Sequence, residues 1–226
     1  MSSVSTRWTV IRRAAQGIPA DQAEFVGRYG SVIRAYLVAR WRHTALFDQV
    51  EDAAQQVLLD CFKKDGALSR ADPDRETGFR AFLYGVVRNV ALTVERKRAR
   101  TRERQTTSSV DLEAFESKED SCATVFDREW ARTLLRDAAE VQLARARKKG
   151  PDATRRHRLL ALRYGENLAI REIAARWEMD AAVLHREYPK AREEFKRALM
   201  DVVRDLQGGG PEAVDEECTR LLGCFS

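Results

Sequence analysis

Apolar residues recur every three or four positions along most of the chain, a spacing that predicts amphipathic helices. It runs through residues 25–37 and 50–61 and starts again at Phe79. Gly66 is predicted to end the second of these helices, and a loop rich in Asp, Pro and Gly is predicted at 71–78. The helix that follows is apolar and aromatic in its first half and strongly basic in its second half.

The C-terminal half contains a second group of predicted helices. Amphipathic spacing resumes near Phe126 and is broken by Gly and Pro at 150–151. Three further helices are predicted over roughly 153–164, 169–177 and 181–205. The last two have the lengths and the short connection of a helix-turn-helix. No strand-like alternation stands out, so the predicted fold class is all-α.

These patterns predict two helical domains, 1–104 and 126–205, joined by an acidic, flexible linker at 105–125. A tail, 206–226, begins with a glycine run that is typical of a hinge. Beyond it, a short amphipathic helix and a loosely docked tail are both compatible with the pattern. The helix would use Ala213, Val214, Cys218, Leu221 and Leu222.

Charge is distributed in blocks along this basic chain of 226 residues, whose net charge is +5. Residues 70–104 hold ten Arg and Lys against five acids, whereas 105–127 hold six acids and one Lys. Such segregation predicts an anionic partner for the basic blocks. No apolar stretch approaches the roughly eighteen residues of a transmembrane helix, and the N-terminus is too polar for a signal peptide. A cytoplasmic protein without a membrane partner is therefore expected.

The residues that carry enzyme chemistry are sparse. The three histidines stand in no recognisable catalytic spacing, and the glycine run lacks the Lys of a phosphate-binding loop. The four cysteines form no C-x-x-C pair, so neither a metal site nor a disulfide framework is expected. We therefore expect a protein that is not an enzyme and that needs no cofactor.

The predicted helix-turn-helix favours DNA binding, because its second helix would enter the major groove. Side chains suited to phosphates or base edges are Arg171, His185, Arg186, Lys190, Arg192 and Lys196. The alternative is that these charges only solvate a helix face. Pro189 lies within the second helix and is expected to kink or break it, because proline cannot donate a backbone hydrogen bond to His185.

The helix that starts at Phe79 combines aromatic rings with cations, a combination that can stack and track unpaired bases. The candidate residues are Phe79, Arg80, Phe82, Tyr84, Arg88, Asn89, Arg96, Lys97, Arg98 and Arg100. The loop at 68–78 lies where a pocket for an extruded base could form. The alternative for Phe79 and Phe82 is packing in the helix core.

Three motifs together resemble bacterial RNA polymerase sigma factors of the extracytoplasmic-function type. VEDAAQQVLLDCF resembles the helix of sigma domain two that docks on core polymerase. FRAFLYGVVRNVALTVERKRAR resembles the helix that reads and melts the −10 element, with Phe82 where Trp is usual. LRYGENLAIREIAARWEMDAAVLHREYPKAREEF resembles sigma domain four, which reads the −35 element.

The resemblance implies that domain 1–104 binds core RNA polymerase and opens promoter DNA, and that domain 126–205 binds the −35 duplex. The polymerase-binding residues would be Glu51, Asp52, Gln55 and Gln56, where Gln56 replaces a usual Glu. The −10 contacts would be Phe79, Arg80, Phe82, Tyr84, Arg88, Asn89, Arg96, Lys97 and Arg98. Melting would be driven by binding energy without a cofactor.

Control by an anti-sigma factor or a Ser/Thr kinase is a further hypothesis. Several segments resemble a subgroup of these factors that is linked to Ser/Thr kinases, in which phosphorylation compensates for a weakened acidic docking motif. This chain keeps the acidic residues Glu51 and Asp52 of that motif. Two other functions stay open: a helix-turn-helix regulator that never engages polymerase, and a helical adaptor or anti-sigma-like protein. The adaptor would show little affinity for DNA even at low salt.

Overall fold

The computed structural model describes residues 7–75, 77–103, 119–206 and 210–223. Within these ranges the chain is all-helical and contains no strand. It divides into two compact units: the first runs to Thr133 and takes in the residues from Arg204 onward, and the second is Leu134–Val203. Most of the linker expected at 105–125 lies outside the described residues. Its end, from Glu119, is helical and belongs to the first unit.

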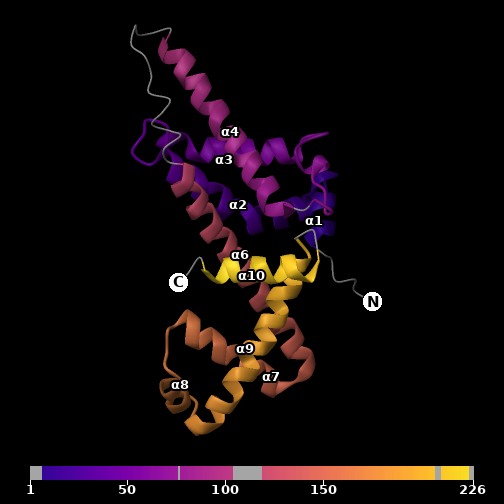
Figure 1. Cartoon of the computed structure of the whole chain (residues 1–226), viewed down its shortest axis with the longest axis vertical. Coiled ribbons are helices and arrows are strands. Elements are labelled where there is room, and N and C mark those ends of the chain that lie inside the picture. Colours follow the sequence, from indigo (N-terminus) through magenta and orange to yellow (C-terminus); the bar gives the residue numbers. More distant parts are fainter. Residues whose placement is uncertain (1–6, 76, 104–118, 207–209, 224–226) are drawn as a thin grey trace. The chain divides into compact units, whose positions relative to one another are not determined.

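The first unit is built on α1 (Arg7–Ala15), α2 (Pro19–Trp41), α3 (Val50–Phe62) and α4 (Gly78–Glu103) (Figure 1). Helix α2 packs against α1, α3 and α4, and α3 also packs against α4. Two short 3-10 turns, Phe47–Gln49 and Leu68–Arg70, precede α3 and α4. The unit also contains the start of α6 (Glu119–Lys149) and the tail helix α10 (Pro211–Gly223).

The turn that follows α3 requires a glycine at position 66. A Cβ atom at this position would lie 2.6 Å from the carbonyl oxygens of both Asp60 and Lys63. The backbone can therefore turn back closely enough for the Ala67 N–H to donate to the Asp60 oxygen at 2.8 Å. The helix therefore ends at Phe62, a few residues before the predicted stop, and Gly66 is the residue of the following turn where only glycine fits without displacing backbone.

Aromatic rings fill the core of the first unit. Phe79, at the start of α4, is 1% exposed, and its ring centroid lies 5.4 Å from that of Tyr29 and 5.6 Å from that of Trp8. Trp130 of α6 stacks on Tyr29 at 5.6 Å. Core packing is thus the interpretation that holds for Phe79. Its buried ring cannot stack on an unpaired base in this conformation.

The tail contributes to the same unit. The Leu206 carbonyl accepts a hydrogen bond from the Phe79 N–H at 3.1 Å, which satisfies a backbone donor in the first turn of α4. In α10, Val214 and Leu221 are buried, and Arg220 pairs with Asp127 of α6 at 3.0 Å. Of the two interpretations of the tail, the amphipathic helix is the one observed.

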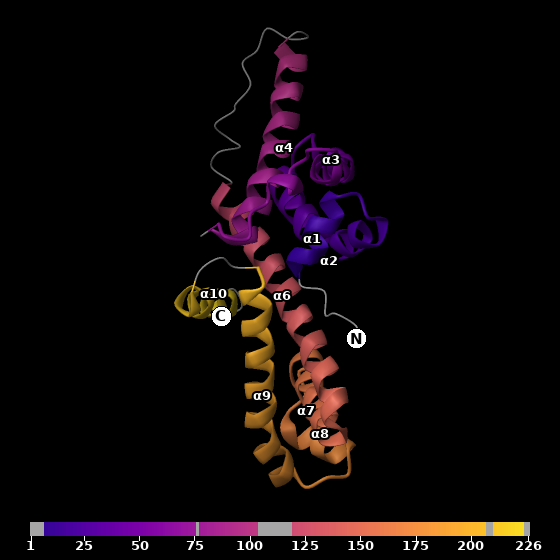
Figure 2. The same ribbon diagram turned by 90° about the vertical axis from the view of Figure 1, so that its right-hand side faces the viewer.

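The second unit contains the end of α6, α7 (Pro151–Leu160), a π-helical turn (Ala161–Gly165), α8 (Ile170–Arg176) and α9 (Ala181–Arg204) (Figure 2). Its small core joins Leu159, Leu162, Ile173, Ala174 and Leu184. The turn between α8 and α9 places Glu178 at φ 51°, and Asp180 caps α9 by accepting from the Ala182 N–H at 2.8 Å. Helices α8 and α9 are therefore the predicted helix-turn-helix pair.

Helix α9 runs through Pro189 without interruption, so the break considered from the sequence does not occur. The ring is exposed, and the His185 carbonyl necessarily lacks its usual i+4 donor. We expect Pro189→Ala to raise the free energy of unfolding of the protein by roughly 1–2 kcal/mol, because the donor is restored and the ring clash is removed. Thermal and urea unfolding, with Pro211→Ala at the start of α10 as the control, would check this. An unchanged or lower stability would contradict it.

Candidate nucleic-acid interface

Helix α3 has one exposed face and one buried face. Val50, Ala53, Val57 and Cys61 are buried against the first unit, and burial raises the pKa of the Cys61 thiol to about 12. The opposite face, about 140° wide, is exposed. It carries all four residues predicted to bind polymerase, together with an apolar side chain that is 62% exposed: Glu51, Asp52, Gln55, Gln56 and Leu59.

The polar side chains of this face form hydrogen bonds with α2 and with neighbouring residues of the same segment. Glu51 accepts a hydrogen bond from the exposed Arg34 of α2. Gln56 donates to Asp60 at 3.2 Å, and Asp60 also accepts from Lys63 at 2.8 Å. The structure thus brings the four predicted residues together on one accessible surface, which we call the α3 face.

A groove of about 400 Å³ lies beside the α3 face. One side is lined by Gln56 and Asp60 of α3 and by Lys63 directly after it, and Ala67 and Arg70 of the following segment contribute to it. The other side is α4, with Val86, Asn89, Val90, Thr93, Val94 and Lys97. The groove therefore combines apolar walls with three cations, one carboxylate and two exposed amides. Of the loop at 68–78, where a pocket was expected, Arg70 lines the groove, and the contributions of Lys63 and Thr93 were not expected from the sequence.

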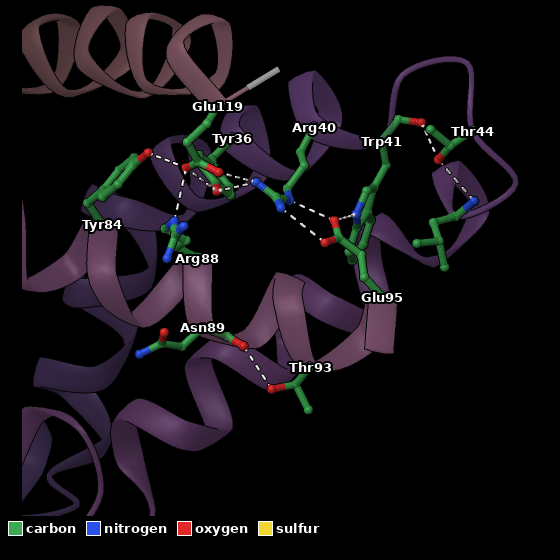
Figure 3. A network of polar contacts seen from close by, with 11 residues as sticks. Tyr36, Arg40, Trp41, Thr44, Tyr84, Arg88, Asn89, Thr93, Glu95 and Glu119 are labelled. Carbon is green, nitrogen blue, oxygen red and sulfur yellow. Dashed lines mark hydrogen bonds and ion pairs between the residues drawn. The ribbon is translucent and has the colours of Figure 1, made fainter. Parts of the chain in front are cut away.

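The predicted −10 residues are divided between two sides of α4, because positions nine apart in a helix lie about half a turn apart. Asn89 and Lys97 line the groove. Arg80, Tyr84 and Arg88 lie on the opposite side and contact the beginning of α6. Figure 3 shows Tyr84 and Arg88 turned toward Glu119, with Thr93 on the other side of the helix. Residues grouped together from the sequence thus form two separate surfaces.

Two carboxylates of α6 bind the side of α4 that carries Arg80, Tyr84 and Arg88. Glu119 lies 3.3 Å from the Arg88 Nε atom and accepts a hydrogen bond from the Tyr84 hydroxyl. Asp127 accepts from Arg80. Burial alone would raise the pKa of Glu119, but hydrogen bonds from Tyr84 and from α2 lower it below the ordinary value. The carboxylate is therefore the favoured form, and these side chains are engaged within the protein.

The same cluster extends into a buried ion pair. Arg40 of α2 is 1% exposed and donates to the two carboxylate oxygens of Glu95 at 2.6 and 3.0 Å (Figure 3). Trp41 Nε1 also donates to Glu95, at 2.9 Å, and Arg40 makes further bonds to Tyr36 and Glu119. Desolvation lowers the pKa of Arg40, but the hydrogen bonds and charge interactions with Glu95, Tyr36 and Glu119 together outweigh it and the pKa is raised. The cluster fixes α2, α4 and α6 to one another.

A stripe along α4 stays accessible. Phe82, Asn89 and Arg96 follow one another at seven-residue spacing, so they lie along the same side of the helix. Phe82 is half-buried, with its ring stacked on Phe79 at a centroid distance of 5.7 Å, and the other two are exposed. Lys97 and Arg100 are exposed nearby, and Arg98 is half-buried.

In the second unit, the predicted −35 residues lie on α8 and α9. All six are exposed: Arg171, His185, Arg186, Lys190, Arg192 and Lys196. The Arg192 guanidinium lies over the Tyr188 ring, 5.8 Å from its centroid, and Lys190 pairs with Glu187 at 2.8 Å. Pro189 lies among them on the exposed side of α9. The unit thus presents a mainly basic helix surface.

Two further properties of the described residues concern alternatives to a nucleic-acid interface. No group of His, Cys, Asp and Glu side chains within them has the arrangement of a metal site. None of their helices is both long and apolar enough to cross a membrane. Comparison with known proteins adds no assignment: no protein-family model matches this sequence, and no curated protein matches it.

Proposed function

We propose that this protein is a sigma factor of the extracytoplasmic-function type, which binds core RNA polymerase and directs it to promoter DNA. The observation that carries the proposal is the juxtaposition of the α3 face with the basic groove. Gln56 belongs to both, so a protein partner on α3 would hold nucleic acid directly beside it. A protein that only binds DNA has no need for the exposed α3 face.

The groove has the chemistry that a single strand requires. Its volume of about 400 Å³ falls in the range of small-molecule pockets, so an extruded base is of suitable size. Asn89 offers both a donor and an acceptor to a base edge. Lys63, Arg70 and Lys97 can neutralise the adjoining phosphates. The accessible stripe of α4 would continue this path through Arg96 and Arg100.

The α6-facing side of α4 has a different role in this proposal. Arg80, Tyr84 and Arg88 would reach DNA only if Glu119 and Asp127 were displaced. We therefore assign first contact with the −10 strand to the groove side and to the basic end of α4. The second unit would bind the −35 duplex with α9 in the major groove. Regulation by an anti-sigma factor or a Ser/Thr kinase stays a prediction.

A second candidate is a helix-turn-helix regulator that does not engage polymerase. It is favoured by the second unit, whose α8–α9 pair and basic surface are complete within Leu134–Val203 and need nothing from α3. This candidate retains salt-sensitive duplex binding but makes no use of the α3 face.

Co-purification with core RNA polymerase separates the two candidates. We expect the wild-type chain to bind stoichiometrically and Glu51→Lys/Asp52→Lys to weaken binding by at least about tenfold, because reversed charges would face a surface that is complementary to acids. The control is Glu24→Lys/Asp74→Lys, which makes the same charge change at exposed positions outside the α3 face. Absence of polymerase binding with intact duplex binding would select the regulator instead.

A further inference from the structure

Arg156 of α7 joins two acidic side chains of the helix proposed to enter DNA. Its Nε and Nη2 atoms donate to the two carboxylate oxygens of Glu194 at 3.0 and 2.8 Å. Its Nη1 atom donates to Glu187 at 3.0 Å. Arg156 is only 16% exposed, so these bonds are less screened by solvent than those of a surface pair. No sequence pattern had drawn attention to this residue.

Glu187 is shared between Arg156 and the DNA-facing surface. One carboxylate oxygen accepts from Arg156, and the other accepts from Lys190 Nζ at 2.8 Å. Hydrogen bonds from Lys190 and Arg156 hold the pKa of Glu187 below its ordinary value. Lys190 itself is 63% exposed and is one of the predicted phosphate contacts. Two carboxylates and two cations thus form one neutral cluster.

We propose that Arg156 is a positioning residue for duplex binding, an inference that rests on the proposed function of the second unit. It draws Glu187 and Glu194 toward α7 and compensates their charge. Lys190 can then exchange its bond to Glu187 for a DNA phosphate, because Glu187 keeps a cationic partner. Without Arg156, Glu187 would have Lys190 as its cationic partner and would hold it back from DNA. The carboxylates of Glu187 and Glu194 would also repel the phosphates of an approaching DNA duplex.

The geometry favours arginine at this position. Three N–H groups of one planar guanidinium reach two carboxylates that stand seven residues apart on α9. A lysine ammonium is a single point charge on a flexible stem and does not reproduce this fork. Arg156→Lys should therefore restore only part of what Arg156→Gln loses.

The test measures affinity for a mixed-sequence duplex of about two helical turns at several salt concentrations. We expect Arg156→Gln to weaken binding about tenfold at low salt, with a smaller loss at high salt, where charge is screened. The control is Arg155→Gln, which removes the same charge from the neighbouring position, where the side chain pairs with Asp152 at 2.8 Å. It should change the affinity by less than about twofold.

Rescue distinguishes positioning from loss of fold. In the Arg156→Gln background, Glu187→Gln should return the affinity to within about threefold of the wild type, because Lys190 is then released. With Arg156 intact, Glu187→Gln alone should tighten binding slightly, which tests the idea even if Arg156→Gln unfolds. Equal effects of Arg156→Gln and Arg155→Gln, or failure of both Glu187 variants to gain affinity, would overturn the inference. Wild-type protein that binds no duplex would instead refute the DNA-binding function itself.

Discussion

Replacing Glu95 with alanine is expected to lower the free energy of unfolding of this protein by about 3–5 kcal/mol, the usual cost of removing one partner from a buried ion pair. Glu95 accepts three hydrogen bonds, two from Arg40 and one from Trp41. Arg40 is 1% exposed and would be left with a desolvated charge facing an empty space. Tyr36 and Glu119 engage only its Nη1 atom. The Nε and Nη2 donors would therefore lose their partner.

Urea unfolding followed by circular dichroism would measure this effect. Glu24→Ala is a suitable control, since Glu24 forms an exposed pair with Arg28 four residues away, and it should cost about 0.5 kcal/mol or less. Glu95→Gln should fall between the two, because the amide oxygen can still accept from Arg40 Nε and Trp41 Nε1 while the compensating charge is lost. A loss below about 1 kcal/mol for Glu95→Ala would mean that water replaces the carboxylate and that the pair does not organise the unit.

Neutralising the basic end of α4 is expected to have the largest effect on nucleic-acid binding. The variant Arg96→Gln/Lys97→Gln/Arg100→Gln removes three exposed cations that follow the groove along one helix. If each one neutralises a phosphate of a single strand, the slope of log affinity against log salt should fall by about two, since each contact contributes about 0.7. At low salt we expect an affinity loss of about a hundredfold.

The measurement is titration of a single-stranded oligonucleotide of roughly twelve nucleotides at several salt concentrations. The matched control is Arg12→Gln/Arg42→Gln/Arg128→Gln, which removes three exposed cations of the first unit that lie outside α4. It changes the net charge equally but leaves the groove intact. Equal losses in the two variants would show that general charge drives binding and would remove the support that α4 gives to the proposed function.

The sequence pattern directly indicated which face of a helix is buried and which is exposed. The spacing of apolar residues predicted one apolar face of α3, made of Val50, Ala53, Ala54, Val57, Leu58 and Cys61. Ala54 and Leu58 are half-buried and the other four are buried, while Glu51 and Asp52 are exposed. The helix-turn-helix was equally accessible, because α8, the turn and the start of α9 follow one another directly along the chain and their core is largely local. In both cases the period of the pattern specifies which side of a helix meets its neighbours.

The start of α6 was misassigned because composition and spacing gave different answers. Its acidic composition predicts a linker at 105–125, but Cys122, Phe126 and Trp130 stand four residues apart and are all buried in the first unit. That apolar spacing was the available signal. The acids beside it, Glu119 and Asp127, could not be recognised as partners of Arg88 and Arg80, since the partners of each pair lie far apart in the sequence and on different helices.

The sequence by itself thus determined most of the helices, their buried faces and the location of the basic blocks, because each depends on residues within a few turns of one another. It did not reveal α1 or the first residues of α6. The tertiary structure alone decided which cations face a groove and which face a carboxylate. Arg80 and Asn89 looked equivalent along the chain, yet one pairs with Asp127 and the other lines the groove. Likewise, Arg40 with Glu95, and Arg156 with Glu187 and Glu194, meet only when separate helices pack. Charge compensation over such distances leaves no periodic trace in a sequence.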